Sequence, residues 1–233
     1  MQVFYHPEIT EGNNYLGAEE SHHCSKVLRM KSGEEVSLID GNGTMAEGVI
    51  KNPDPKSSLI SIDKIFKNYN PRPYRLNVAI APPKSNSRFE WFLEKSTEIG
   101  IDKITPIYCE RSERKTINRN RAKKIIWSAM KQSITAHEPK LEEMTSFKDF
   151  IENNRQKNTY MAYCNNDIII HLQEVANSNT DTCVLIGPEG GFSPAEAELA
   201  LNNNIALVSL GKSRLRTETA GLVVCQILNL INQ

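Results

Sequence analysis

The sequence predicts two domains, a small β domain followed by a larger α/β domain. Short apolar runs separated by turn residues fill the chain up to Lys67 and are typical of strands. Proline and asparagine then interrupt regular structure from Asn68 to Pro73, which predicts a linker. After this break, apolar runs alternate with segments of helical spacing, and this alternation is typical of helices packed on a parallel sheet.

The size and composition are those of a globular protein. Its 233 residues suffice for a core without disulfide or metal support, and 39% hydrophobic with 24% charged residues is an ordinary balance. No basic segment leads into an apolar one at the start, and no apolar run has the length of a membrane span. The five cysteines are odd in number and widely spaced, and neither CxxC nor HExxH occurs. We therefore expect a cytoplasmic protein with reduced thiols, no membrane association and no metal.

The β domain is expected to contain one helical stretch and a hairpin. Helical spacing runs from Glu20 to Met30, and Gly41-Asn42-Gly43 contains the Asn-Gly dipeptide of a tight hairpin turn. The strands expected here are Glu35–Asp40, Thr44–Lys51 and Ser58–Phe66. Together these elements suggest a small barrel of about 65 residues, a shape often used to hold RNA.

The α/β domain opens with a strand and a helix that carries capping signals. Ser87 and Glu90 have the spacing of a capping box, and Gly100 has the position of a C-cap. The elements expected in this part of the chain are the strands Leu76–Ala81, Ile104–Cys109 and Thr159–Cys164, and helices that begin at Ser87, cover Arg119–Ser133 and cover Ser146–Asn153.

Two apolar runs near the C-terminus each end in an unusual loop and then enter a helix. Cys183–Ile186 precedes the first loop, and Ser193 with Glu196 predicts a capping box for the helix after it. Ile205–Leu210 precedes the second loop, which leads to a helix over Gly221–Ile231 that is apolar on nearly all sides. Such a helix fits either a subunit interface or a central position in the monomer.

The first loop, Gly187-Pro188-Glu189-Gly190-Gly191, allows a ligand to approach the backbone closely. Its glycines tolerate positive φ, and its free amides can donate hydrogen bonds. It is neither a GxGxxG fingerprint nor a P-loop, and Glu189 would repel a phosphate. A neutral or cationic ligand fits better, for example the sulfonium of S-adenosylmethionine. A tight turn without a ligand explains the loop equally well.

The second loop, Gly211 to Ala220, concentrates charge and hydroxyl groups between two apolar segments. Arg214, Arg216 and Glu218 would be costly to desolvate there without partners or a ligand. An ion pair of Arg216 with Glu189 or Glu218 is the structural alternative. Because both loops follow strands of one parallel sheet, we expect them to share its ligand-binding edge.

The charges are unevenly distributed although the formal net charge is zero. From Tyr69 to Lys124 there are 13 Lys and Arg against 6 Asp and Glu, and half of the residues from Arg111 to Lys124 are basic. Such a cluster is typical of a phosphate-binding surface, although a solvated helix face would show the same composition.

Several motifs together resemble the RsmE family. These are IGPEGGFSPAE, LGKSRLRTETA, RFEWFLEKSTEIGI, KITPIYCERSER, AMKQS and HHCSKVLRMKSGEEVSLIDGNG, and the resemblance covers essentially the whole chain. It implies an S-adenosylmethionine-dependent methyltransferase that acts on N3 of a uridine in 16S ribosomal RNA of the small subunit. It also implies a PUA-like β-barrel over residues 1–70, a SPOUT α/β domain with a deep trefoil knot over residues 71–233, and a homodimer.

The resemblance also implies roles for individual residues. The methyl donor would be bound by Ile186, Gly187, Pro188, Glu189, Gly190, Gly191, Leu210, Gly211, Leu215, Arg216, Thr217 and Thr219. Matches to motifs of the active cleft and of the barrel implicate Arg88, Lys95, Arg111, Gln132, His23 and Arg29 in RNA binding, and the basic run adds Arg114, Lys115, Arg119 and Arg121. At two positions where the family often has arginine, this chain has Thr135 and Ser213.

The expected chemistry needs a group that stabilises negative charge and a group that accepts a proton. Uridine N3 must lose its proton, and we expect Arg216 to stabilise the charge that develops on the uracil carbonyls. Glu189 and Glu218 are the candidate proton acceptors, with water as the alternative. Two other functions compete with this one, a non-catalytic RNA-binding protein and a nucleotide-dependent phosphohydrolase.

Overall fold

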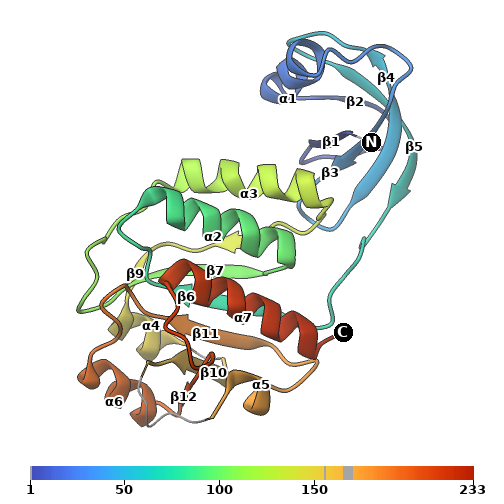
Figure 1. The fold of residues 1–233 in the computed structure, drawn as a ribbon. Helices are drawn as coiled ribbons and strands as arrows, with labels where there is room; N and C mark the ends of the chain where they lie inside the picture. Colours follow the sequence, from blue (N-terminus) through green and yellow to red (C-terminus); the bar gives the residue numbers. More distant parts are fainter. Residues whose placement is uncertain (1, 155, 165–169) are drawn as a thin grey trace. The chain divides into compact units, whose positions relative to one another are not determined.

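A computed structural model describes residues 2–154, 156–164 and 170–233 and divides into two compact units (Figure 1). The first unit comprises Met1–Pro71 and Trp127–Glu138, and the second comprises Arg72–Ile126 and Pro139–Gln233.

The first unit is built on a five-stranded sheet with the order β1-β3-β4-β5-β2. Its elements are β1 (Gln2–Tyr5), β2 (Gly12–Tyr15), α1 (Ala18–His22), the π-helix η1 (His23–Val27), β3 (Glu35–Ile39), β4 (Met45–Asn52) and β5 (Leu59–Phe66). The predicted helix and three predicted strands are confirmed, whereas β1 and β2 were not expected from the pattern. Apolar side chains from the strands and from α1–η1 form the core, among them Phe4, Leu16, Cys24, Leu38, Ile50 and Ile60.

The predicted hairpin between β3 and β4 is confirmed. One carboxylate oxygen of Asp40 accepts hydrogen bonds from the backbone amides of Asn42 and Thr44, at 2.7 and 2.8 Å. Gly43 has φ of +90°, and a Cβ there would lie only 2.5 Å from the ring of His137. The turn therefore requires glycine both for its conformation and for its contact.

Residues 127–138 group with the first unit because they pack against its other elements. The ring of Trp127 stacks on Tyr5 with 5.0 Å between centroids, and Lys131 forms an ion pair with Glu20 at 2.6 Å. The second half of the helix over Arg119–Ser133 thus belongs to the first unit, and the first half belongs to the second unit.

The second unit contains a parallel sheet with the order β12-β10-β11-β6-β7-β8, in which β9 also pairs with β7. The parallel arrangement predicted from the alternating pattern is confirmed. Its strands are β6 (Leu76–Ile80), β7 (Lys103–Tyr108), β8 (Lys140–Leu141), β9 (Thr145–Ser146), β10 (Asn158–Ala162), β11 (Thr182–Ile186) and β12 (Ala206–Val208). The helices are α2 (Asn86–Ile99), α3 (Arg119–Ser133), α4 (Phe147–Asn153), α5 (Leu172–Val175), α6 (Pro194–Asn202) and α7 (Thr217–Ile231).

Helices cover both faces of this sheet. On one face, α2 and α7 run side by side, and Gly221 of α7 allows the ring of Phe92 and the side chain of Ile80 to approach closely (Figure 1). On the other face, α4 and α6 pack on Ala79, Leu185 and their neighbours. Strand residues therefore alternate between two apolar layers, and both sides of the central strands are buried.

The structure confirms one predicted capping box and contradicts the other. Ser193 and Glu196 form both hydrogen bonds of the box at the start of α6. By contrast, α2 begins after Ser85 without a side-chain cap, so the box predicted for Ser87 and Glu90 is wrong. The reason is tertiary, because the Glu90 carboxylate binds the guanidinium of Arg121 instead.

The last helix begins at Thr217, four residues before the predicted start at Gly221. Within the described ranges, no helix is long and apolar enough to cross a membrane, and no group of three or more His, Cys, Asp or Glu side chains is arranged to hold a metal ion. The trefoil knot implied by the family resemblance stays a prediction.

Candidate functional site

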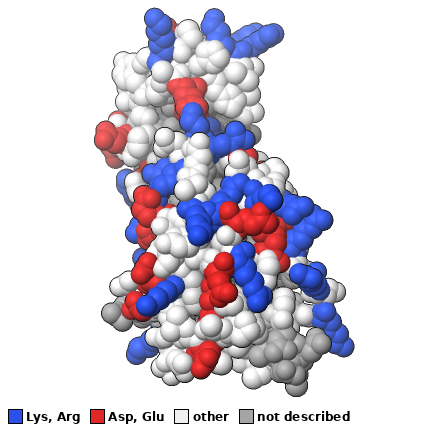
Figure 2. Space-filling model, turned by 90° about the vertical axis from the view of Figure 1, so that its left-hand side faces the viewer, with Lys and Arg blue, Asp and Glu red and all other residues white. Residues whose placement is uncertain are grey.

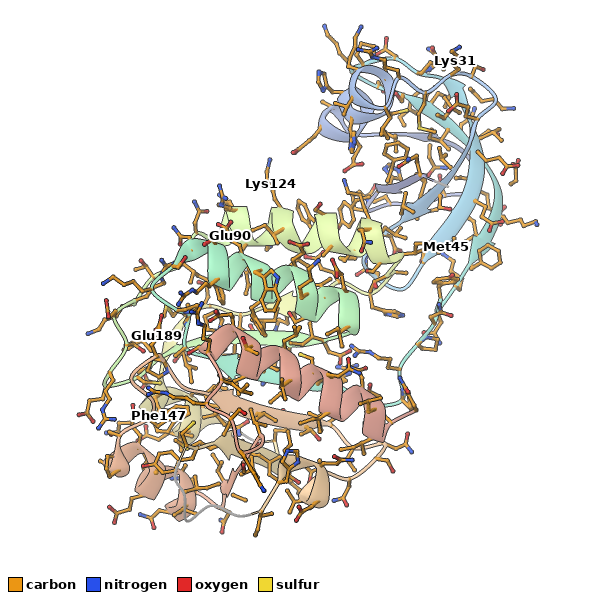
Figure 3. All side chains as sticks on the ribbon, in the orientation of Figure 1. Lys31, Met45, Glu90, Lys124, Phe147 and Glu189 are labelled. Atoms are coloured by element: carbon orange, nitrogen blue, oxygen red, sulfur yellow. The ribbon has the colours of Figure 1, made fainter. Side chains whose placement is uncertain are left out.

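The loops that follow β6, β7, β11 and β12 lie at one edge of the second unit, because parallel strands all end on the same side. Glu90 and Glu189 both lie toward this edge (Figure 3). Figure 2 faces it and shows Lys and Arg side chains gathered there, interspersed with Asp and Glu. This edge is therefore where ligand-binding groups from separate segments converge.

The structure brings the two predicted loops together. The hydroxyl of Thr217, on the first turn of α7, donates a hydrogen bond to the carbonyl of Gly187 at 3.0 Å. Thr217 is buried, and Gly187 is the first residue after β11. Thirty residues separate these two positions in sequence, so the bond ties the end of one strand to the start of the last helix.

The loop after β11 has a compact backbone that other loops support. The amide of Gly191, at φ of +70°, donates to the carbonyl of Pro188 at 2.8 Å and closes a turn. Arg111 donates to the carbonyl of Gly190 at 3.0 Å, and a Cβ on Gly190 would lie 3.1 Å from the Arg111 side chain. The loop is thus a tight turn whose backbone Arg111 approaches closely, and ligand binding by this loop stays a prediction.

Two carboxylates fasten this loop to its neighbours. An oxygen of Glu189 accepts a hydrogen bond from the backbone amide of Lys84 at 2.9 Å, while the rest of the residue is exposed. Glu196 is buried and accepts from the backbone amides of Ser193 and Glu110, both at 2.8 Å. The loops after β6, β7 and β11 are therefore joined by charge-assisted hydrogen bonds.

The loop after β12 presents cations to solvent. Gly211 has φ of +124°, and Lys212, Arg214 and Arg216 are exposed. In the part of the chain that the structure describes, these three side chains have no carboxylate partner. The alternative ion pair of Arg216 with Glu189 or Glu218 is therefore wrong.

Glu218 occupies a different environment from the other charged residues of this loop. Only 8% of its side chain is exposed, and its Oε1 lies 3.7 Å from Nε of Arg88 on α2. Its Oε2 is buried and has no hydrogen-bond partner among the described residues. A buried carboxylate oxygen without a partner is costly, and it is the strongest local sign of a functional constraint.

Intramolecular ion pairs occupy several of the residues that the sequence assigned to RNA. Arg119 pairs with Glu143 at 2.7 Å, and Arg121 pairs with Glu90. Lys95 pairs with two glutamates on its own helix. Each of these cations is therefore already engaged by a carboxylate of its own unit.

The other predicted RNA-binding residues fall into two groups. Arg111, Arg114 and Lys115 belong to the loop between β7 and α3 in the second unit, whereas His23, Arg29 and Gln132 belong to the first unit. Arg29 adopts φ of +55° just after η1 and is exposed.

A cleft near this edge was not expected from the sequence. It has a volume of about 500 Å³ and lies between the start of α2 and the segment that leads into α3. Its polar lining residues follow the ends of β6 and β7, and the basic run from Arg111 to Lys124 supplies Arg114 and Arg121 to its wall. We call it the α2–α3 cleft.

Comparisons with known proteins agree with this geometry. Residues 70–229 match the family model of an RNA methyltransferase domain, and residues 16–63 match that of an RNA methyltransferase PUA domain. The ribosomal RNA small subunit methyltransferase E of Rickettsia conorii is 28% identical over 241 residues, which cover 99% of this chain and 95% of that protein.

Two solved structures are similar over almost the entire chain. A probable rRNA-methyltransferase from Porphyromonas gingivalis is 38% identical with a TM-score of 0.91, covering 100% of this chain and 98% of that one. A ribosomal RNA small subunit methyltransferase E from Neisseria gonorrhoeae, bound to S-adenosyl methionine, is 26% identical with a TM-score of 0.87, covering 100% and 98%.

Proposed function

Because the chain belongs to the family of RNA methyltransferases, we propose that it transfers the methyl group of S-adenosylmethionine to N3 of a uridine in 16S ribosomal RNA. The observation that carries the proposal is the hydrogen bond between Thr217 and Gly187, which joins the two loops expected to hold the donor. The matched relative from Neisseria gonorrhoeae has S-adenosyl methionine bound, which supports the same assignment.

The residues at this edge fit the donor chemically. S-adenosylmethionine supplies a methyl group on a positively charged sulfur. It carries no phosphate, so its binding site does not need cations that would bind one. The exposed glycine backbone offers hydrogen-bonding groups, and Glu189 offers a negative charge. Apolar side chains that are buried or half-buried flank the two loops, namely Ile186, Pro188, Leu210 and Leu215. These residues, with Gly187, Gly190, Gly191, Gly211 and Thr219, are the proposed donor-binding set.

Arg216 is the proposed group that stabilises the uracil. It is exposed at the N-cap position of α7, directly before Thr217, and has no carboxylate partner among the residues described. A guanidinium without a counter-charge can donate to a carbonyl oxygen on which negative charge develops. Its position next to the donor loops would let it act while the base is held for methyl transfer.

Glu189 is the better candidate for accepting the N3 proton. A proton acceptor must lie within hydrogen-bonding distance of the base, and Glu189 is exposed on the donor loop. Glu218 is buried beside Arg88, where a base cannot reach it without a rearrangement. We propose that Glu218 instead positions Arg88. Replacing Glu189 with Gln should lower kcat.

The methylation assay tests the whole proposal. The protein is incubated with labelled S-adenosylmethionine and small ribosomal subunits from cells that lack it, and the nucleosides are identified by mass spectrometry. We expect 3-methyluridine with the wild type and much less with Arg216→Ala. Arg75→Ala is the matched control, because Arg75 is exposed at the opposite edge of the sheet. If the wild type forms no methyluridine, the proposed function is wrong. If Arg216→Ala forms it at the wild-type rate, the proposed role of Arg216 is wrong.

Thermal stabilisation by ligands separates the competing functions. A methyltransferase should be stabilised by S-adenosylmethionine or its demethylated product, whereas a phosphohydrolase should respond to ATP. A non-catalytic RNA-binding protein should respond to neither ligand.

We also propose that the protein works as a homodimer. The outer side of α7 is apolar, with Val223 and Ile227 partly exposed and Leu230 55% exposed, and Trp91 on the adjacent α2 is 39% exposed. Exposed apolar side chains on two adjacent helices fit a subunit interface. Leu230→Glu should lower the molar mass measured by light scattering. Leu201→Glu, at an equally exposed position on α6, should leave it unchanged.

The two domains have different proposed roles. Residues 1–70 would hold RNA as a PUA-like module, with His23 and Arg29 contributing, and residues 71–233 would carry out methyl transfer. We propose that this takes place in the cytoplasm, where the small ribosomal subunit is found.

A further inference from the structure

The α2–α3 cleft lies in the second unit and has a polar rim. The start of α2 contributes Ser85, Asn86 and Ser87, and the opposite wall contributes Arg114 and Asn118. A second hollow of about 690 Å³ continues from it and is lined in addition by Lys84, Glu113 and Lys115. The two together form an open polar channel beside the edge that carries the donor loops.

Arg114 is held across this cleft by neutral acceptors. Its guanidinium donates to the side-chain oxygen of Asn86 and to the backbone carbonyl of Lys84. Among the described side chains, no carboxylate pairs with Arg114. A guanidinium that is already oriented, yet keeps its full charge, is well suited to bind an anion such as a phosphate.

The surrounding charges favour an anion as well. The two hollows are lined by four cations, Lys84, Arg114, Lys115 and Arg121, and by two carboxylates, Glu90 and Glu113. Both carboxylates are already paired, Glu90 with Arg121 and Glu113 with Lys84. The hydrogen bond from Arg121 also lowers the pKa of Glu90, so this pair keeps both charges near neutral pH. The four cations exceed the two carboxylates by two positive charges, which remain available to bind an anion.

The lining fits a phosphate group better than a nucleobase. Stacking of a base requires an exposed aromatic ring, and the aromatic residue in the wall of the α2–α3 cleft, Phe89, is 4% exposed. Besides the two paired carboxylates, the polar groups of the lining are hydroxyls, amides and cations, which are the groups that contact the backbone of nucleic acids.

The second hollow, which shares Asn86 and Arg114 with the α2–α3 cleft, adjoins the donor loop. The backbone amide of Lys84, which lines the second hollow, donates to Glu189 of the donor loop at 2.9 Å. We propose, on the basis of the proposed function, that this cleft binds a phosphodiester of the RNA strand close to the methylated nucleotide, with Arg114 as the principal contact. Arg119 points elsewhere, because it binds Glu143 and the carbonyl of Leu141. The basic run thus contains one phosphate site and not a uniform charged surface.

Binding of variants to the small ribosomal subunit tests this proposal. Subunits from cells lacking the protein are titrated with wild type, Arg114→Ala, Arg119→Ala and the control Arg75→Ala over a series of salt concentrations. We expect Arg114→Ala to weaken binding about tenfold and to reduce the slope of log affinity against log salt by about one. Arg119→Ala and Arg75→Ala should each change affinity by less than about twofold.

Parallel measurements keep the outcome independent of folding and of the proposed function. The thermal midpoint and the S-adenosylmethionine Kd of Arg114→Ala should match the wild type. If that variant folds poorly, Lys115→Ala at an exposed position of the same channel should still reduce the salt slope. Wild-type affinity and slope in the Arg114 or Lys115 variants would overturn the phosphate site. A wild-type protein that binds subunits but transfers no methyl group would instead overturn the proposed function alone.

Discussion

Replacing Thr217 with Val tests whether the two loops act as one donor site. Valine keeps the shape of the buried side chain and removes the hydroxyl that donates to Gly187 at 3.0 Å. A neutral intramolecular hydrogen bond contributes about 1 kcal/mol to the free energy of unfolding. The carbonyl left without a donor adds to the destabilisation only if water cannot reach it. Gly187 is half-buried, so we expect the free energy of unfolding to fall by about 1 to 2 kcal/mol.

The same bond should influence affinity for the donor. If the free loops separate without it, binding must order them again, and a cost of about 1 kcal/mol corresponds to about fivefold weaker binding. At a donor concentration of about 100 times the wild-type Kd, bound ligand stabilises the wild type by about 2.7 kcal/mol and the variant by about 1.8 kcal/mol. For a chain of this size, the donor should then raise the Tm by about 5–11 °C in the wild type and about 4–7 °C in the variant.

Calorimetric titration with S-adenosylmethionine and thermal unfolding with and without it provide the two readouts. Thr159→Val is the matched control, because Thr159 is buried and donates to the carbonyl of Gln156 at 2.7 Å, at the start of β10 and away from the donor loops. The Thr159 hydroxyl also accepts a hydrogen bond from the Asn154 side chain at 2.9 Å, so this variant should lose at least as much stability and keep the wild-type Kd. If Thr217→Val is destabilised and yet binds the donor as tightly as the wild type does, the bond is structural only and the reasoning is refuted.

Three further predictions concern the framework around the site. The exposed thiol of Cys164 should react quickly with a disulfide reagent in the native protein, and the four buried thiols should not. Burial raises the pKa of a thiol such as Cys183 to about 12, so it stays protonated below that pH. Rapid reaction of several thiols would contradict this prediction. Gly221→Ala should lower the free energy of unfolding, measured by chemical denaturation, by about 1–3 kcal/mol. Alanine has the better helix propensity, but its Cβ would lie 2.6 Å from the ring of Phe92. A stabilised variant would show that α2 and α7 can move apart at no cost. Ser193→Ala should cost about 1 kcal/mol by the same measurement through loss of the helix cap, and an unchanged midpoint would show that the cap is redundant.

The local elements could be predicted well because their signals are local. The hairpin at Gly43, the capping box at Ser193 and the helix over Arg119–Ser133 depend on residues a few positions apart. Predictions were less accurate where neighbours were distant in sequence. Glu90 binds Arg121, 31 residues away, and not the start of its own helix. The sequence of α2 gives no sign that a distant arginine would bind Glu90.

The candidate site was predictable in its residues and not in its contacts. The motifs identified the two loops, and parallel strands implied that they share an edge. The contact between Thr217 and Gly187, and the burial of Glu218 beside Arg88, follow from how α7 packs on α2 and the sheet. By residue type and position in the motifs Glu189 and Glu218 are equivalent candidates, whereas in the fold Glu189 is exposed and Glu218 is buried.

By itself, then, the sequence determined the main strands and helices, the parallel sheet and the identity of the two glycine-containing loops, since periodicity and turn chemistry act over short stretches of chain. It did not predict β1 or β2. Only the tertiary structure decided which cations are already paired and which face an open cleft. Arg119 and Arg114 are five residues apart and equally basic, yet the first binds Glu143 and the second lines the α2–α3 cleft. The availability of a charge depends on partners that folding brings from distant parts of the chain, and no local pattern contains that information.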